Sequence, residues 1–119
     1  MKIAIVGGLE RNEIQFRQIA SKKGHILGYH NGKVGGRGAK ELNRLVTSSS
    51  FVIILMTVNS HGGVQMAKRM ARQKNRPSII LMRCGLGTFK NILNSLEEKY
   101  INKNNIAEDY ILHRLAASA

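Results

Sequence analysis

Four short apolar runs, separated by stretches with helical periodicity, constrain the fold of this chain more than any other feature. The runs are rich in Ile, Val, Leu and Met, and they cover residues 2–6, 25–29, 51–56 and 78–82. Runs of this length that are followed by Gly or polar residues are typical of buried parallel strands. The sequence therefore predicts a sheet of four parallel strands.

The stretches between these runs have the spacing of amphipathic helices. Helices are predicted over residues 10–23, 39–47, 62–74, 87–100 and, near the C-terminus, about 105–117. Each has apolar residues that recur at the helical period and can face a sheet. In the first helix, the residues expected to face the core are Ile14, Phe16, Ile19 and Ala20.

The alternation of strands and helices predicts one Rossmann-like α/β domain over residues 1–119. With right-handed crossovers, it forms a three-layer sandwich whose parallel sheet has the order 2-1-3-4, plus an extra C-terminal helix. That order puts a switch point between the first and third strands, and ligands of such sheets bind beyond the carboxyl ends of the strands. Because four strands leave two open edges, a homodimer formed through an edge or the terminal helix is expected.

Charge is the strongest indication of function in this sequence. The formal net charge is +12, and the 55 residues between Glu41 and Glu97 contain eight Lys or Arg and no carboxylate. A pI of about 10.5 favours a polyanionic partner, above all nucleic acid. The alternatives are an acidic protein or an anionic membrane surface.

The cations gather in two segments. One lies in and just after the glycine-rich stretch 31–38, and the other covers the third predicted helix and the loop after it. Such runs are often solvated faces, but the second segment lacks acidic partners one helical turn away. We therefore expect a non-enzymatic protein that binds DNA or RNA at the phosphate backbone, with these contacts: Lys33, Arg37, Lys40, Lys68, Arg69, Arg72, Lys74 and Arg76.

The predicted strand ends carry small, hydroxyl, amide and cationic residues, and each precedes a helix N-terminus, which favours anions. In any single loop, such residues can equally form tight turns and helix caps. The alternative function is therefore binding of a nucleotide or another phosphorylated metabolite, in a regulatory or catalytic role. The residues predicted for this anion site are Gly7, Gly8, Asn59, Ser60, His61 and Arg83.

Several kinds of chemistry are disfavoured by the sequence. Gly7-Gly8 does not extend to G-x-G-x-x-G, and the second strand ends without the acidic residue of a dinucleotide site. Cys84 lies in a strand-to-helix loop like that of tyrosine phosphatases, but Lys90 stands where their Arg is required, so no working nucleophile is expected. The His and Cys spacings match no metal motif. We assign no catalytic residue, metal or cofactor.

The sequence also bears on location. It has no apolar stretch of 18 residues, so no membrane span is expected. Its single cysteine suits a reducing compartment, and a cytoplasmic protein is expected.

Four motifs, in this order and spacing, resemble a widespread bacterial domain of unknown function. They are Ile5-Val6-Gly7-Gly8, His30-Asn31-Gly32, Val58-Asn59-Ser60-His61 followed by Ala67-Lys68, and the set Pro77, Arg83 and Gly85. The domain is small and Rossmann-like, with an IVGG start and a T-x-x-S-H turn after its third strand, and the resemblance covers about residues 3–95. It implies no established activity, and it does not imply the large basic excess. It draws attention to Gly7, Gly8, Ser60, His61, Lys68 and Arg83.

Overall fold

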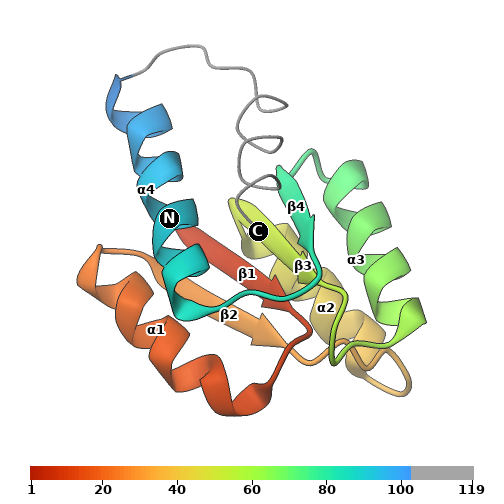
Figure 1. The fold of residues 1–119 in the computed structure, drawn as a ribbon. Coiled ribbons are helices and arrows are strands. Elements are labelled where there is room, and N and C mark those ends of the chain that lie inside the picture. Colours follow the sequence, from red (N-terminus) through yellow and green to blue (C-terminus); the bar gives the residue numbers. More distant parts are fainter. Residues whose placement is uncertain (103–119) are drawn as a thin grey trace.

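The computed structural model describes residues 1–102, which form a four-stranded parallel sheet covered by helices on both faces (Figure 1). The strands are β1 (Lys2–Val6), β2 (Ile26–His30), β3 (Phe51–Leu55) and β4 (Ser78–Leu81). They lie in the order β2-β1-β3-β4, and all three pairs are parallel. The predicted strand order and sense are confirmed, and each strand boundary agrees with the prediction to within one residue.

The helices divide between the two faces of the sheet. They are η1 (Glu10–Asn12), α1 (Glu13–Lys22), α2 (Gly38–Ser48), α3 (His61–Gln73) and α4 (Leu86–Asn102). Buried residues of α1 and α4 form one core layer with the sheet, and those of α2 and α3 form the other (Figure 1). This is the Rossmann-like sandwich that the sequence predicts. The helix predicted over residues 105–117 lies outside the described residues.

Alternate residues of the central strands supply the two core layers. Ile3 and Ile5 of β1 pack toward α1 and α4, whereas Ala4 and Val6 pack toward α2 and α3. All five residues of β3 are buried, as expected for a strand covered on both faces.

The prediction that Ile14 faces the core is wrong. Ile14 is 68% exposed, while Phe16 and Ala20 are buried and Ile19 is partly buried against the same layer. Because a helix turns about 100° per residue, Phe16, Ile19 and Ala20 share one side, and Ile14 lies about 200° away from Phe16. The ring of Phe16 completes that side by meeting Phe89 of α4 edge to face, with ring centroids 5.0 Å apart.

Candidate nucleic-acid interface

Helices α2 and α3 lie side by side on the same face of the sheet. Leu42 and Val46 of α2, and Val64 and Ala67 of α3, are buried in the core layer beneath them. Because side chains radiate evenly around a helix, residues half a turn from these positions face solvent. Most basic residues of both helices occupy that outer side.

On α2 and the residue before it, three cations form one stripe. Arg37, Lys40 and Arg44 are spaced by three and four residues, so they lie above one another on the helix surface. All three are exposed, and with Glu41 they line a surface depression. Arg44 was not among the residues predicted from the sequence. Its position one helical turn after Lys40 was the signal that could have found it.

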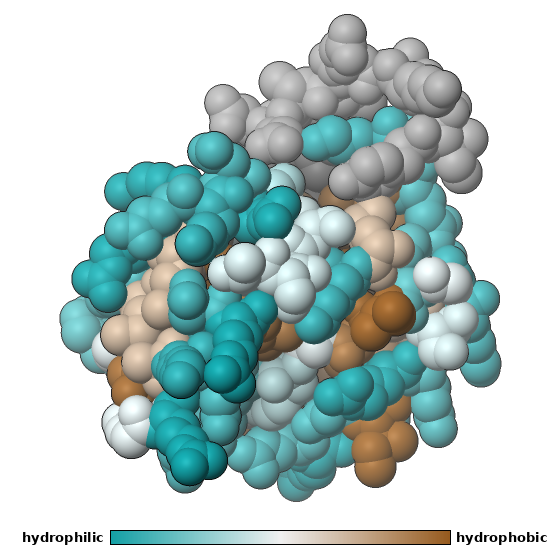
Figure 2. Space-filling model, turned by 180° about the vertical axis from the view of Figure 1, so that it is seen from behind, coloured by the Kyte–Doolittle hydropathy of each residue, from teal (hydrophilic) through white to brown (hydrophobic). Residues whose placement is uncertain are grey.

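On α3, Arg69 and Arg72 are exposed on the outer side of the helix, whereas Lys68 is half-buried on its flank. The α2–α3 basic face is defined here as Arg37, Lys40, Arg44, Arg69 and Arg72. Figure 2 views the molecule from the side that α2 and α3 cover, and hydrophilic side chains spread over the middle of that view. The two predicted clusters of cations therefore meet on one surface.

The remaining predicted nucleic-acid contacts lie around this face. Lys33 is exposed in the loop before α2, and Lys74 is exposed just after α3. Arg76 differs, because it is half-buried and its Nη2 donates a hydrogen bond to the carbonyl oxygen of Thr47, 2.9 Å away. Since Thr47 lies in the last turn of α2, Arg76 satisfies a carbonyl that the helix leaves unpaired.

The few acidic residues lie mostly elsewhere. The described residues include five carboxylates, of which only Glu41 belongs to α2 or α3; the others are Glu10, Glu13, Glu97 and Glu98. The ion pairs between described residues are Arg17 with Glu13 and Lys23 with Glu97, and the His25 ring also contacts Glu97; all lie in the α1 and α4 layer or the loop after α1. No cation of the α2–α3 basic face pairs with a carboxylate within residues 1–102.

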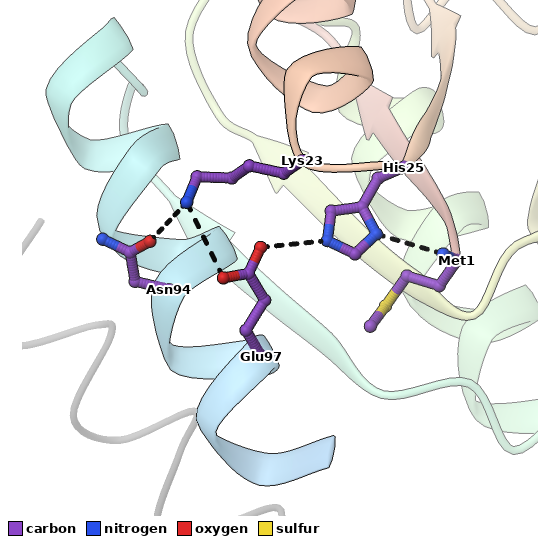
Figure 3. A network of polar contacts seen from close by, with 5 residues as sticks. All are labelled: Met1, Lys23, His25, Asn94 and Glu97. Atoms are coloured by element: carbon purple, nitrogen blue, oxygen red, sulfur yellow. Dashed lines mark hydrogen bonds and ion pairs between the residues drawn. The ribbon is translucent and has the colours of Figure 1, made fainter. Parts of the chain in front are cut away.

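Figure 3 shows how one of these carboxylates is used. Glu97 lies 3.7 Å from Lys23 Nζ and 3.4 Å from His25 Nε2, and Lys23 Nζ also donates to Asn94 Oδ1 at 2.7 Å. The amino group of Met1 lies 3.0 Å from His25 Nδ1. This network joins the start of β1 to α4, so it neutralises charge on the side of the sheet opposite the α2–α3 basic face.

The residues predicted for an anion site do gather at the carboxyl ends of the strands. Gly7 and Gly8 follow β1 with φ angles of +92° and +81°, which favour glycine. The Gly7 N–H donates to the carbonyl oxygen of His30 at 2.8 Å, and the Gly8 N–H lies 3.1 and 3.0 Å from those of Thr57 and Val58. These two N–H groups therefore tie the ends of three strands together and are not free for a phosphate.

Asn59 is packed among the glycines of neighbouring loops. Its Nδ2 donates to the carbonyl oxygen of Leu55 at 2.7 Å, and a Cβ added to Gly7 would lie only 2.6 Å from that nitrogen. A Cβ added to Gly32 would overlap Asn59 Oδ1, and one added to Gly63 would lie 2.6 Å from it. Asn59 therefore holds the rim loops in place, and sequence reasoning missed this role because the contacts join distant residues.

Ser60 is the N-cap of α3. Its Oγ accepts a hydrogen bond from the Gly63 N–H at 2.8 Å and donates one to the carbonyl oxygen of Gly32 at 2.7 Å. The hydroxyl thus satisfies one free donor of the helix and one carbonyl of the loop after β2. These contacts favour the alternative that the sequence left open for this loop, in which Ser60 forms a helix cap and does not bind an anion.

What the rim still offers an anion is limited. The N–H groups of His61 and Gly62 have no acceptor within residues 1–102, and the His61 side chain is exposed. Arg83 is exposed in the loop after β4. These groups face solvent at one end of the sheet, and they belong to loops whose other predicted residues are already hydrogen-bonded.

The described residues contain little that could support covalent or metal chemistry. Burial raises the pKa of the Cys84 thiol to about 11, so the thiol is protonated at neutral pH and is a poor nucleophile. Within residues 1–102, no three His, Cys, Asp or Glu side chains come together as metal ligands would.

None of the helices formed by the described residues is long and apolar enough to cross a membrane. A search of curated proteins and a search of solved structures returned no match. A family model described as "Uncharacterized protein conserved in bacteria" matches residues 2–96, which run from β1 into α4 and include both the rim and the α2–α3 basic face. The match confirms the resemblance found in the sequence, and the chain belongs to this family of bacterial proteins of unknown function.

Proposed function

We propose that this protein binds DNA or RNA at the phosphate backbone through the α2–α3 basic face, without catalysing a reaction. The observation that carries the proposal is the separation of charge between the two sides of the sheet. The α2–α3 basic face has five exposed cations beside one carboxylate, Glu41. The carboxylates that pair with cations, Glu13 and Glu97, lie in the α1 and α4 layer on the opposite side of the sheet. Unpaired cations on a folded surface attract polyanions. When they neutralise the phosphates of a nucleic acid, the counterions condensed on that nucleic acid are released.

The dimensions of the face suit a nucleic-acid backbone. Arg37 and Arg44 are seven residues apart, about 10 Å along the helix, and α3 lies alongside. Duplex DNA carries one charge per about 1.7 Å of its axis, so a face of this length meets several phosphates. Neither helix contains a Phe, Tyr or Trp on which a base could stack. The interface therefore favours backbone contacts with little reading of base sequence.

The test is the salt dependence of binding to a duplex oligonucleotide, measured by fluorescence anisotropy. Each phosphate contact contributes about −0.9 to the slope of log K against log salt concentration. The double variant Arg44→Ala with Arg69→Ala should reduce the magnitude of this slope by about 1.8.

The matched control removes two exposed cations from the opposite side of the sheet, through Lys22→Ala with Lys90→Ala. This control changes the net charge by the same amount and should leave the slope unchanged. An absence of binding to any DNA or RNA oligonucleotide at low salt would refute the proposal. An equal effect of both double variants would show that net charge, and not this face, is responsible.

A phosphorylated metabolite at the rim is the second candidate, and it has less support because Gly7, Gly8 and Ser60 already make internal hydrogen bonds. The free N–H groups of His61 and Gly62 are what favour it. A nucleotide that raises the melting temperature of the wild type and of the Arg44→Ala, Arg69→Ala variant would support this candidate. The homodimer and the cytoplasmic location stay predictions, and light scattering of the purified protein tests the first.

A further inference from the structure

The side of β4 that faces the α2 and α3 layer exposes apolar side chains. Ile79 and Leu81 are buried in the α1 and α4 layer, so the alternation along β4 turns Ile80 to the opposite side. Met82 follows directly after the strand. Ile80 is 37% exposed and Met82 is 65% exposed. Met56, 49% exposed, follows β3, and its N–H donates to the carbonyl oxygen of Leu81 at 2.8 Å, next to Met82 in the chain. Met56, Ile80 and Met82 are named here the β4 strip.

Unpaired cations border this strip. Gly62 lies against Val34 and Met66 packs into the same core layer, which identifies the flank of α3 that faces α2. Lys68 lies on the other flank, toward β4, and Arg72, one turn later, lies between this flank and the outer side. Neither pairs with a carboxylate within residues 1–102. An apolar strip is therefore flanked by positive charge.

Among residues 1–102, no strand pairs with the outer edge of β4. The carbonyl oxygens of Pro77 and Leu81 accept hydrogen bonds from Val52 and Met56, at 3.0 and 2.8 Å. The N–H and C=O of one strand residue point to the same edge, and successive residues alternate between the two edges, so those of Ile80 point away from β3. Residues 78–82 contain none of the charged residues or prolines that usually protect an exposed edge from pairing.

We infer that the β4 edge binds an acidic, extended peptide segment of a partner protein as an added strand. The peptide backbone pairs with the open groups of β4, its apolar side chains cover the β4 strip, and its carboxylates meet Lys68 and Arg72. A second copy of this chain fits less well, because its own cations would face Lys68 and Arg72. Nucleic acid fits less well, because it has no peptide groups for the strand edge.

The test measures fluorescence anisotropy of labelled ten-residue peptides with the full chain. The probe repeats Val-Ser-Glu-Ser, so that Val and Glu share one face of the added strand. Two control peptides replace its Glu by Lys and its Val by Ser. Only the probe should bind. Met82→Asp puts a charge into the β4 strip, and Lys68→Glu reverses a charge that meets the peptide carboxylates. Each should weaken binding about tenfold or more. Matched controls are Ile26→Asp, a 66% exposed residue of the opposite edge strand, and Lys40→Glu on α2, and neither should change the affinity.

Several results would overturn the inference. The first is no saturable binding of the probe, and the second is equal binding of the Ser and Glu peptide, which would show attraction by charge alone. Loss of oligonucleotide binding in Met82→Asp would assign the β4 strip to nucleic acid. A wild-type dimer that Met82→Asp dissociates would assign it to a second copy. The Arg44→Ala, Arg69→Ala variant keeps the β4 strip, so it should still bind the probe even if the proposed nucleic-acid function fails.

Discussion

Replacing Gly32 by alanine tests whether Asn59 holds the rim loops together. Gly32 has a φ of +87°, so alanine there is strained, and its Cβ would overlap Asn59 Oδ1 and lie 2.6 Å from Cγ. Gly24 is a natural control, because its φ is +77° but no atom lies within 4 Å of an added Cβ. The two substitutions therefore share backbone strain and differ in the clash with Asn59.

The expected magnitudes follow from these contacts. Gly24→Ala should cost about 1 kcal/mol of unfolding free energy, since a left-handed backbone is strained for alanine. Gly32→Ala must also displace the Asn59 amide, whose Nδ2 donates to the Leu55 carbonyl oxygen at 2.7 Å. Losing that bond and leaving a buried acceptor unpaired adds about 2 kcal/mol. The total, about 3 kcal/mol, is a large part of the stability of an ordinary domain.

Urea unfolding followed by circular dichroism measures both costs. A double-mutant cycle with Asn59→Ala isolates the contact, because the three atoms nearest to the added Cβ all belong to the Asn59 amide. In the Asn59→Ala background, Gly32→Ala should cost only about 1 kcal/mol, the same as Gly24→Ala. Equal destabilisation by Gly24→Ala and Gly32→Ala in the wild type, or no coupling in the cycle, would refute this account of the rim.

Two further predictions concern single side chains. Arg76→Met should lower the unfolding free energy by about 1 kcal/mol, because the Thr47 carbonyl loses its hydrogen bond, and should leave the salt slope of oligonucleotide binding unchanged; a reduced slope would instead make Arg76 a phosphate contact. Burial raises the pKa of Cys84 from 9.0 to about 11, so the folded state favours the protonated thiol, and the stability this gives is complete below pH 9 and is lost between pH 9 and 11. Accordingly, a disulfide reagent at pH 8 should modify Cys84 much more slowly in the folded protein than in urea, and equal rates would contradict its burial.

The strand order and the layers could be predicted from the sequence because they depend on patterns local to each element. Four apolar runs separated by helical stretches allow few arrangements once crossovers must be right-handed. The error at Ile14 arises because apolar character alone does not place a residue in the core. Only apolar residues that recur at the helical period share one side of a helix, and Ile14 lies on the side of α1 opposite to Phe16.

What the tertiary structure decided is which polar groups are free and which cations share a surface. Arg44 joined Lys40 and Arg69 on one face because α2 and α3 pack side by side, whereas Arg76, an equally basic residue in the sequence, donates to Thr47. Ser60 makes internal hydrogen bonds to residues up to 28 positions away. The apolar runs and the excess of positive charge were evident from the sequence, because the polarity and charge of a side chain depend on the residue type and not on its position in the fold. The partners of a polar side chain were not, because hydrogen bonds and packing join residues that only the folded chain brings together.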